Sequence, residues 1–148
     1  MRTILPQIIA ERAAGRDCVL VSLIADTGSA PRGKGSLMLV GAQGRIAGTV
    51  GGGAIERHCE NMGKTLTAEK HSGIHEFILR ANRTEDIGMI CGGDVTAHFQ
   101  FIPAESPLWD EVLRIAQERT AAHRHGWLIL REDGGAPTLA ADGQCLAG

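Results

Sequence analysis

Clustered glycine is the feature that most constrains how this chain can fold. The sequence holds 20 glycines in 148 residues, and they gather at 28–35, 41–53 and 88–93, between segments with regular apolar patterns. Glycine adopts left-handed backbone conformations readily and lets other groups approach the main chain closely. Clusters of this kind predict the corners of a folded domain. The glycines of 41–44 are explained by an ordinary turn.

The apolar spacing between these corners predicts a single α/β domain over residues 1–148. A continuous apolar run at 18–25 indicates a strand covered on both faces. In the segment 95–101 the apolar side chains alternate with Thr96, His98 and Gln100, which predicts a half-buried strand with these three on its outer face. The combination of hairpins with strand–helix alternation favours a mixed sheet with flanking helices. The remaining predicted elements are helices at 3–14, 54–67 and 106–123, a hairpin at 36–40 and 45–50, a strand at 74–79, and a last hairpin at 127–130 and 138–141.

Composition argues against several classes of function. Lys and Arg total 15 against 17 Asp and Glu, a net charge of −2, and the basic residues are scattered, so we expect no nucleic-acid partner. No apolar run approaches the roughly 20 residues that cross a bilayer, so we expect no membrane span. Residues 1–15 are too charged for the apolar segment of a signal peptide. We therefore expect a cytoplasmic protein.

The cysteines and histidines do not form a metal-binding pattern. Cys18, Cys59, Cys91 and Cys145 lie far apart and include no C-x-x-C pair. An even count permits two disulfides, but Cys18 and Cys59 fall on apolar faces, which is typical of reduced core thiols. No histidine pair has the spacing of a zinc site with a carboxylate partner. The sequence predicts no metal site.

The first candidate site is the segment Gly48-Thr-Val-Gly-Gly-Gly-Ala-Ile-Glu56. A strand that leads through glycines into a helix presents backbone N–H groups and the positive end of the helix dipole, which attract anions. The segment is neither G-x-G-x-x-G nor a P-loop. Glu56 has two readings. It caps the helix from position N3, with Gly53 as N-cap, or it accepts hydrogen bonds from a heterocycle with adjacent N–H groups.

Two further segments carry candidate chemistry. Cys91-Gly92-Gly93 stands just before the strand at 95–101, and a thiol between glycines suits nucleophilic, sulfur-carrying or redox work, or is a small residue in a tight turn. Arg32 and Lys34 follow the buried strand at 18–25 and offer cations to a phosphate or carboxylate, or form a solvated surface loop. The residues alone leave both choices open.

Taken in order, Gly28-Ser-Ala-Pro-Arg32, the segment 48–56 and Cys91-Gly92-Gly93 resemble the XdhC/CoxI family, maturation factors for xanthine dehydrogenase and related molybdenum hydroxylases. The resemblance covers about residues 3–102. It implies a protein that binds molybdenum cofactor, protects it while the terminal sulfur is installed, and delivers it to the hydroxylase apoenzyme. It also implies a homodimer and contact with a cysteine desulfurase. The residues carried over are Arg32, Gly51, Gly52, Gly53, Glu56, Cys91, Gly92 and Gly93.

We hypothesise that the cofactor's phosphate meets the helix start, its pterin N–H edge meets Glu56, and its metal end meets Cys91. This hypothesis requires the three segments to line one pocket. Two other functions stay open: an enzyme in which Cys91 transfers sulfur or acts as a redox thiol, and a docking module that binds the hydroxylase without cofactor. Family members usually continue into a C-terminal Rossmann-like domain. We expect this chain to be the N-terminal domain without it, which is either a stand-alone domain, one truncated at the C-terminal end, or one whose partner domain lies on another chain.

Overall fold

A five-stranded sheet organises the structure, with its most apolar strand at the centre. The computed structural model describes residues 1, 3–26, 34–78 and 94–148. The strand order is β3-β2-β1-β5-β4, so β1 lies between β2 and β5. The bounds are β1 Cys18–Asp26, β2 Leu37–Gly41, β3 Gly44–Gly48, β4 Gly73–Ile78 and β5 Asp94–Ile102.

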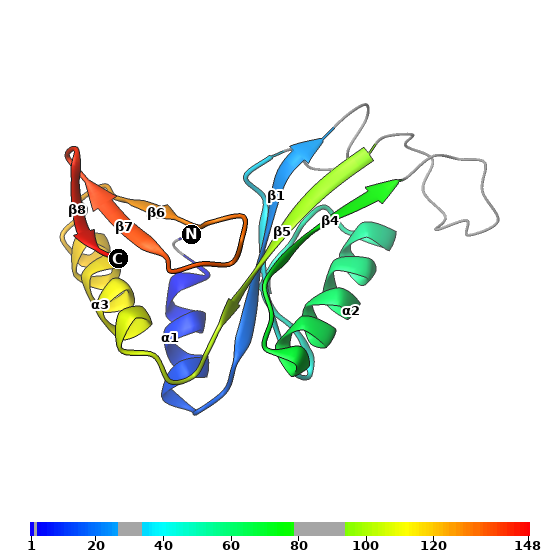
Figure 1. Ribbon diagram of the computed structural model, residues 1–148, viewed down its shortest axis with the longest axis horizontal. Coiled ribbons are helices and arrows are strands. Elements are labelled where there is room, and N and C mark those ends of the chain that lie inside the picture. Colours follow the sequence, from blue (N-terminus) through cyan, green and yellow to red (C-terminus); the bar gives the residue numbers. More distant parts are fainter. Residues whose placement is uncertain (2, 27–33, 79–93) are drawn as a thin grey trace.

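Helices cover both faces of this sheet (Figure 1). Helix α2 (Gly53–Glu69) lies on one face, and α1 (Leu5–Ala13), α3 (Pro107–Ala121) and a small second sheet lie on the other. The small sheet has the order β6-β7-β8. Its bounds are β6 Trp127–Ile129, β7 Thr138–Ala141 and β8 Gln144–Ala147. No helix in the described part of the chain is long and apolar enough to cross a membrane.

The predicted α/β class is confirmed, but two details of the sheets differ from expectation. Every strand pair that the structure describes is antiparallel, whereas we expected a mixed sheet. Short connections such as that between β2 and β3 permit only antiparallel neighbours. Strand β8 was not predicted. Its signal is the Asp142-Gly143 turn, where both residues have positive φ (53° and 77°), the conformation that suits a tight hairpin.

The sheet separates two apolar clusters. Val21, Met38 and Phe99 point toward α2, whereas Leu20 and Ile102 point toward α1 and α3. All five are at most 1% exposed. Because both faces are covered, β1 is buried on both sides, as its continuous apolar run predicts.

The prediction that His98 and Gln100 face outward is wrong. They are 4% and 2% exposed, because α1, α3 and the segment after β6 cover the face on which they lie. An alternating pattern marks which side chains share a face but not whether a later segment covers that face. Burial lowers the pKa of His98, although a hydrogen bond to the backbone of Arg131 opposes this effect.

The buried cysteines behave as expected. Cys18 and Cys59 are free thiols at 0% exposure. Burial raises the pKa of each to about 12. They are therefore core residues with little thiolate at neutral pH, consistent with reduced thiols.

Candidate functional site

The sheet register places the ends of two predicted site segments on neighbouring strands. Asp26, the last described residue before 27–33, pairs with Val95 of β5. Ile78, the last described residue before 79–93, pairs with Asp94. Helix α2 begins at this same end of the sheet (Figure 1). The candidate residues Arg32 and Cys91-Gly92-Gly93 lie outside the described residues, so the meeting of their side chains with the third segment stays a prediction.

The third segment is described throughout, and we call residues 49–56 the glycine corner. Gly51, Gly52 and Gly53 have φ of 127°, 80° and 64°, three successive positive values. Gly52 combines its φ with ψ of −177°, a region that is essentially restricted to glycine. The glycine run is therefore required by the backbone path from β3 into α2.

The glycine at position 52 also faces open space, which distinguishes it from other glycines nearby. A Cβ at Gly48 would lie 2.3 Å from the carbonyl oxygen of Leu37, and one at Gly63 would lie 2.9 Å from Val40. Those two glycines are needed for packing within the protein. A Cβ at Gly52 would have no atom within 4 Å. The main chain at Gly52 therefore borders a space that no described atom fills.

Glu56 caps the helix, as one of its two predicted roles proposed. The N-cap is Gly52, one residue earlier than expected, and its N–H donates to Glu56 Oε2 at 3.1 Å. The hydroxyl of Thr49 donates to the same oxygen. Oε1 forms an ion pair with Arg45 at 2.9 Å. Both carboxylate oxygens therefore have partners within the protein.

These partners keep Glu56 ionised. Burial raises the pKa of this carboxyl, but the hydrogen bond from Thr49, the charge of Arg45 and the backbone N–H groups of Gly52 and Val50 together bring it below its ordinary value. The carboxylate is 16% exposed. Its negative charge would repel a bound anion, and Arg45 offsets that charge.

The start of α2 retains one exposed donor for a ligand. The N–H groups of Gly53, Ala54 and Ile55 have no acceptor among the described residues, as is usual for the first turn of a helix, but Ala54 and Ile55 are each 1% exposed and of the three only Gly53 is open to solvent. Together with the dipole of a 17-residue helix, the Gly53 N–H suits an oxygen atom of an anion. Such a site binds and orients a group. Nothing among the described residues of the corner is a nucleophile positioned for catalysis.

Sequence reasoning missed Thr49 and Arg45, which shape the corner. Thr49 Oγ1 also accepts from Gly51 N–H at 3.2 Å, a local turn that a threonine two residues before a glycine can signal. Arg45 lies on β3 and reaches Glu56 only because the chain folds back, so no local signal identifies it. In the described part of the chain, no His, Cys, Asp and Glu gather to hold a metal ion.

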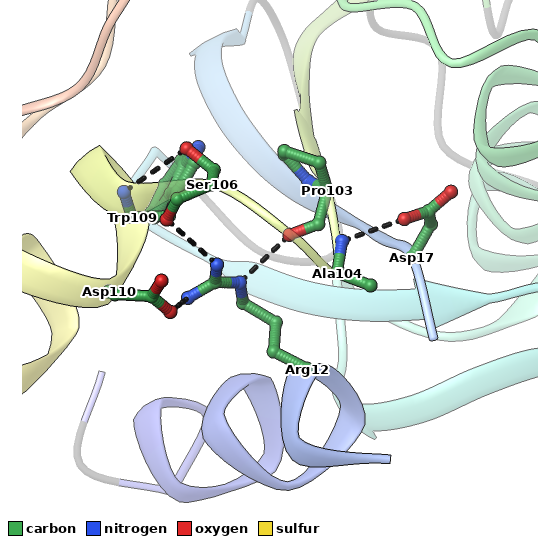
Figure 2. Close-up of polar contacts among 7 residues, drawn as sticks. All are labelled: Arg12, Asp17, Pro103, Ala104, Ser106, Trp109 and Asp110. Atoms are coloured by element: carbon green, nitrogen blue, oxygen red, sulfur yellow. Dashed lines mark hydrogen bonds and ion pairs between the residues drawn. The ribbon is translucent and has the colours of Figure 1, made fainter. Parts of the chain in front are cut away.

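A second polar network lies on the other side of the sheet (Figure 2). The Arg12 guanidinium, 5% exposed, donates to Pro103 O at 2.8 Å, Ser106 O at 3.0 Å and Asp110 Oδ1 at 2.7 Å. We call these four residues the Arg12 network. It joins α1 to the connection between β5 and α3. Arg12 and Asp110 also line a cavity of about 260 Å³, but the guanidinium already donates to three acceptors, so we assign the network a structural role.

Comparisons with known proteins agree with the resemblance seen in the sequence. The model of the XdhC and CoxI family matches residues 11–78. PaoD of Escherichia coli K12, a molybdenum cofactor insertion chaperone, is 30% identical over 129 residues, which are 84% of this chain and 39% of PaoD. A crystal structure of a xanthine dehydrogenase from Bacillus halodurans has a TM-score of 0.73 at 14% identity, over 97% of this chain and 44% of that one.

The structural likeness shows a shared fold alone, and this chain spans less than half the length of either protein. The sequence comparisons go further. The family match runs from within α1 to the end of β4 and includes the whole glycine corner and Arg32, but not Cys91. With the match to PaoD over most of the chain, it shows that this protein belongs to the XdhC and CoxI family.

Proposed function

We propose that this chain is a maturation factor that holds molybdenum cofactor as cargo and helps its insertion into a xanthine dehydrogenase-type hydroxylase apoenzyme. The chaperone function of PaoD supports this proposal. The observation that carries it is Gly52, whose backbone conformation excludes other residues and whose missing side chain leaves open space beside a helix start. A bare main chain with free N–H groups suits the phosphate of the cofactor.

The cofactor assignments within the proposed site keep the hypothesis drawn from the sequence. The phosphate takes the N–H group of Gly53, and Gly51 and Gly52 let it approach. Glu56 fixes the shape of the corner and accepts a pterin N–H only by giving up one of its present donors. Arg32 supplies a cation, and Cys91 with Gly92 and Gly93 meets the metal end. The proposed role is therefore binding and delivery rather than catalysis.

The wider role that we propose includes partners. The cofactor receives its terminal sulfur while bound, which calls for contact with a cysteine desulfurase, and the carrier acts as a homodimer. The cytoplasm is the proposed location, because buried free thiols such as Cys18 and Cys59 suit a reducing compartment. Each of these points is separate from cofactor binding and is tested separately.

Cofactor binding is tested with molybdenum cofactor released from a purified molybdoenzyme under anaerobic conditions. The chain is mixed with it and passed over a desalting column, and the retained pterin is measured by fluorescence after oxidation. We expect retention by the native chain and at least a tenfold loss for Gly52→Ala, because the added Cβ occupies the open space and strains the corner.

Gly143→Ala is the matched control. Gly143 also has positive φ, 77°, and no atom within 4 Å of an added Cβ, but it lies in the turn between β7 and β8. The substitution also strains a backbone position of positive φ, though less than at Gly52, and it lies far from the corner, so pterin retention should be unchanged. Equal losses in the two variants would show a general effect of strain. No retention by the native chain would favour a docking module that does not touch the cofactor.

Cys91→Ser separates the carrier from an enzyme. Each variant is loaded with sulfur-free cofactor, supplied with a cysteine desulfurase and cysteine, and used to activate a hydroxylase apoenzyme. A carrier in which Cys91 only contacts the cargo retains most of the activation. Loss of activation with normal pterin retention would show that this thiol transfers sulfur or electrons.

A further inference from the structure

A cavity of about 270 Å³ lies on the side of the sheet away from α2, apart from the glycine corner. Its walls come from the start of α1, the second half of α3 and the small sheet. Leu5, Val112, Leu113, Ala116, Leu128 and Leu139 form its apolar lining. An engineered apolar cavity of about 150 Å³ accepts benzene, so this cavity has room for a chain or ring of roughly twice that size.

The ionisable side chains that line the cavity are all basic. They are Arg119, Arg124, His123 and His125, from the end of α3 and the residues after it, and no carboxylate is among the described lining residues. Asp142 approaches Arg119 Nη2 at 3.5 Å, but its side chain is 90% exposed. Among the described residues, Asp142 is therefore the one carboxylate paired with these basic side chains, and its exposure makes the ion pair weak.

Arg119 is held in place before any ligand arrives. Its guanidinium is 17% exposed, and Nε donates to the carbonyl oxygen of His125 at 2.8 Å. Nη1 has no partner among the described residues. A fixed guanidinium with a free N–H edge loses little freedom when it binds a carboxylate. The Arg124 side chain, by contrast, forms no hydrogen bond or ion pair with the described residues.

We propose that this cavity binds a small amphipathic monocarboxylate, with its apolar body among the leucines and its carboxylate at Arg119 and Arg124. An apolar lining beside two guanidinium groups matches that chemistry. The apolar part of the ligand is stabilised by leaving water, and its carboxylate forms charge-assisted hydrogen bonds with the guanidinium groups. The ligand contacts α1, α3 and β7 together, so it stabilises the packing of the small sheet on α3. The proposal does not depend on cofactor binding.

The probe is octanoate, compared with octanol and octylamine, which carry the same apolar chain with a neutral or a positive head. Binding to the native chain is measured by calorimetry and by backbone amide shifts in NMR spectra, up to about 1 mM ligand. We expect octanoate to bind at least tenfold more tightly than octanol, and octylamine to bind least. Shifts should concentrate at residues 112–128 and near Leu5.

The variants Arg119→Gln and Arg124→Gln should each weaken octanoate binding about tenfold and leave octanol within twofold. Arg114→Gln is the matched control, because it lies on the same helix and does not line this cavity. Ala116→Leu fills the cavity and should abolish binding of both ligands. Thr120→Leu, nearer the surface, does the same if the first variant fails to fold.

Three results would overturn the proposal. Octanoate and octanol binding equally would remove the role of the basic residues. Equal effects of Arg119→Gln and Arg114→Gln would show a general effect of charge. Absence of binding to the folded native chain at about 1 mM would show that the cavity does not take this class of ligand.

Discussion

The Arg12 network and the glycine corner both place a charged side chain among several hydrogen-bond partners, yet they serve different purposes. Arg12 bonds to residues more than 90 positions away, on the connection into α3. Glu56 bonds to Thr49 and Gly52, seven and four positions away, and to Arg45 on the adjacent hairpin. The first set of contacts joins distant segments, and the second sets the shape of one short segment.

The difference shows how a structural polar cluster can be told from a candidate site. The guanidinium of Arg12 uses its donors on three acceptors of one distant segment, so the network holds the fold together even though a cavity adjoins it. At the corner, the carboxylate is satisfied within the protein, while Gly52 faces open space and Gly53 is exposed. Open space at a glycine is not sufficient by itself, since Gly143 has it too; at the corner it occurs beside the start of a helix, which is why we treat the corner as the candidate site.

The largest expected effect is that of Arg12→Met. The variant keeps the length and apolar stem of the side chain but removes the three hydrogen bonds of the buried guanidinium; Ser106 O still accepts from the N–H of Asp110. At about 1 kcal/mol for each lost hydrogen bond, we expect a loss of about 3 kcal/mol in the free energy of unfolding. Urea unfolding followed by circular dichroism measures it. A loss below about 1 kcal/mol would show that the network does not hold α1 in place.

Gly52→Ala should come next, with a loss of about 2 kcal/mol, because alanine must adopt a backbone region essentially restricted to glycine. Gly143→Ala should cost about 1 kcal/mol, since its φ of 77° lies in the left-handed region that other residues reach at moderate cost. The same unfolding experiment compares them. A stability equal to that of the native chain for Gly52→Ala would mean that the corner changes shape freely.

Glu56→Gln should lower stability at neutral pH by about 1 kcal/mol, the usual worth of a helix cap. Since the pKa of Glu56 is lowered from 4.5 in the folded chain, its contribution is present above pH 4.5 and is lost as the pH falls through the folded pKa. The variant should therefore lose less stability than the native chain in that acid range. Glu69→Gln, at the other end of α2, should leave the acid dependence unchanged.

His98 provides a reference at higher pH. Its lowered pKa means that folding favours the neutral ring, so stability declines once the pH falls below about 6.5, in the native chain and in Glu56→Gln alike. Unfolding measured from pH 7 to pH 3 should show this common decline first and the difference at Glu56 later. A difference that begins near pH 6 would mean that the substitution disturbs His98 rather than the cap.

The smallest effect should be that of Asp110→Asn. Its carboxylate is 69% exposed, and exposed ion pairs contribute about 0–1 kcal/mol. We expect a loss of no more than about 0.5 kcal/mol, measured in the same way and reduced further by salt. A loss as large as that of Arg12→Met would show that the ion pair, rather than the two carbonyl acceptors, carries the network.

Local sequence patterns were sufficient for most of the fold. The apolar run of β1, the hairpin of β2 and β3, and the cap of α3 by Ser106 were all predictable, because each depends on residues within a few positions. The capping contact of Glu56 was predictable for the same reason, with an error of one residue. The burial of His98 and Gln100 was not, because the segments that cover them, α1, α3 and the residues after β6, belong to other parts of the chain.

The sequence by itself determined where the backbone must turn through left-handed conformations, since only glycine does this at Gly51–Gly53 without strain. It also determined which segments form helices and strands, apart from β8. Only the tertiary structure decided that Arg45 neutralises Glu56, that Arg12 joins α1 to α3, and that Gly52 rather than Gly48 faces open space. Those outcomes depend on contacts between distant residues, which local patterns do not encode.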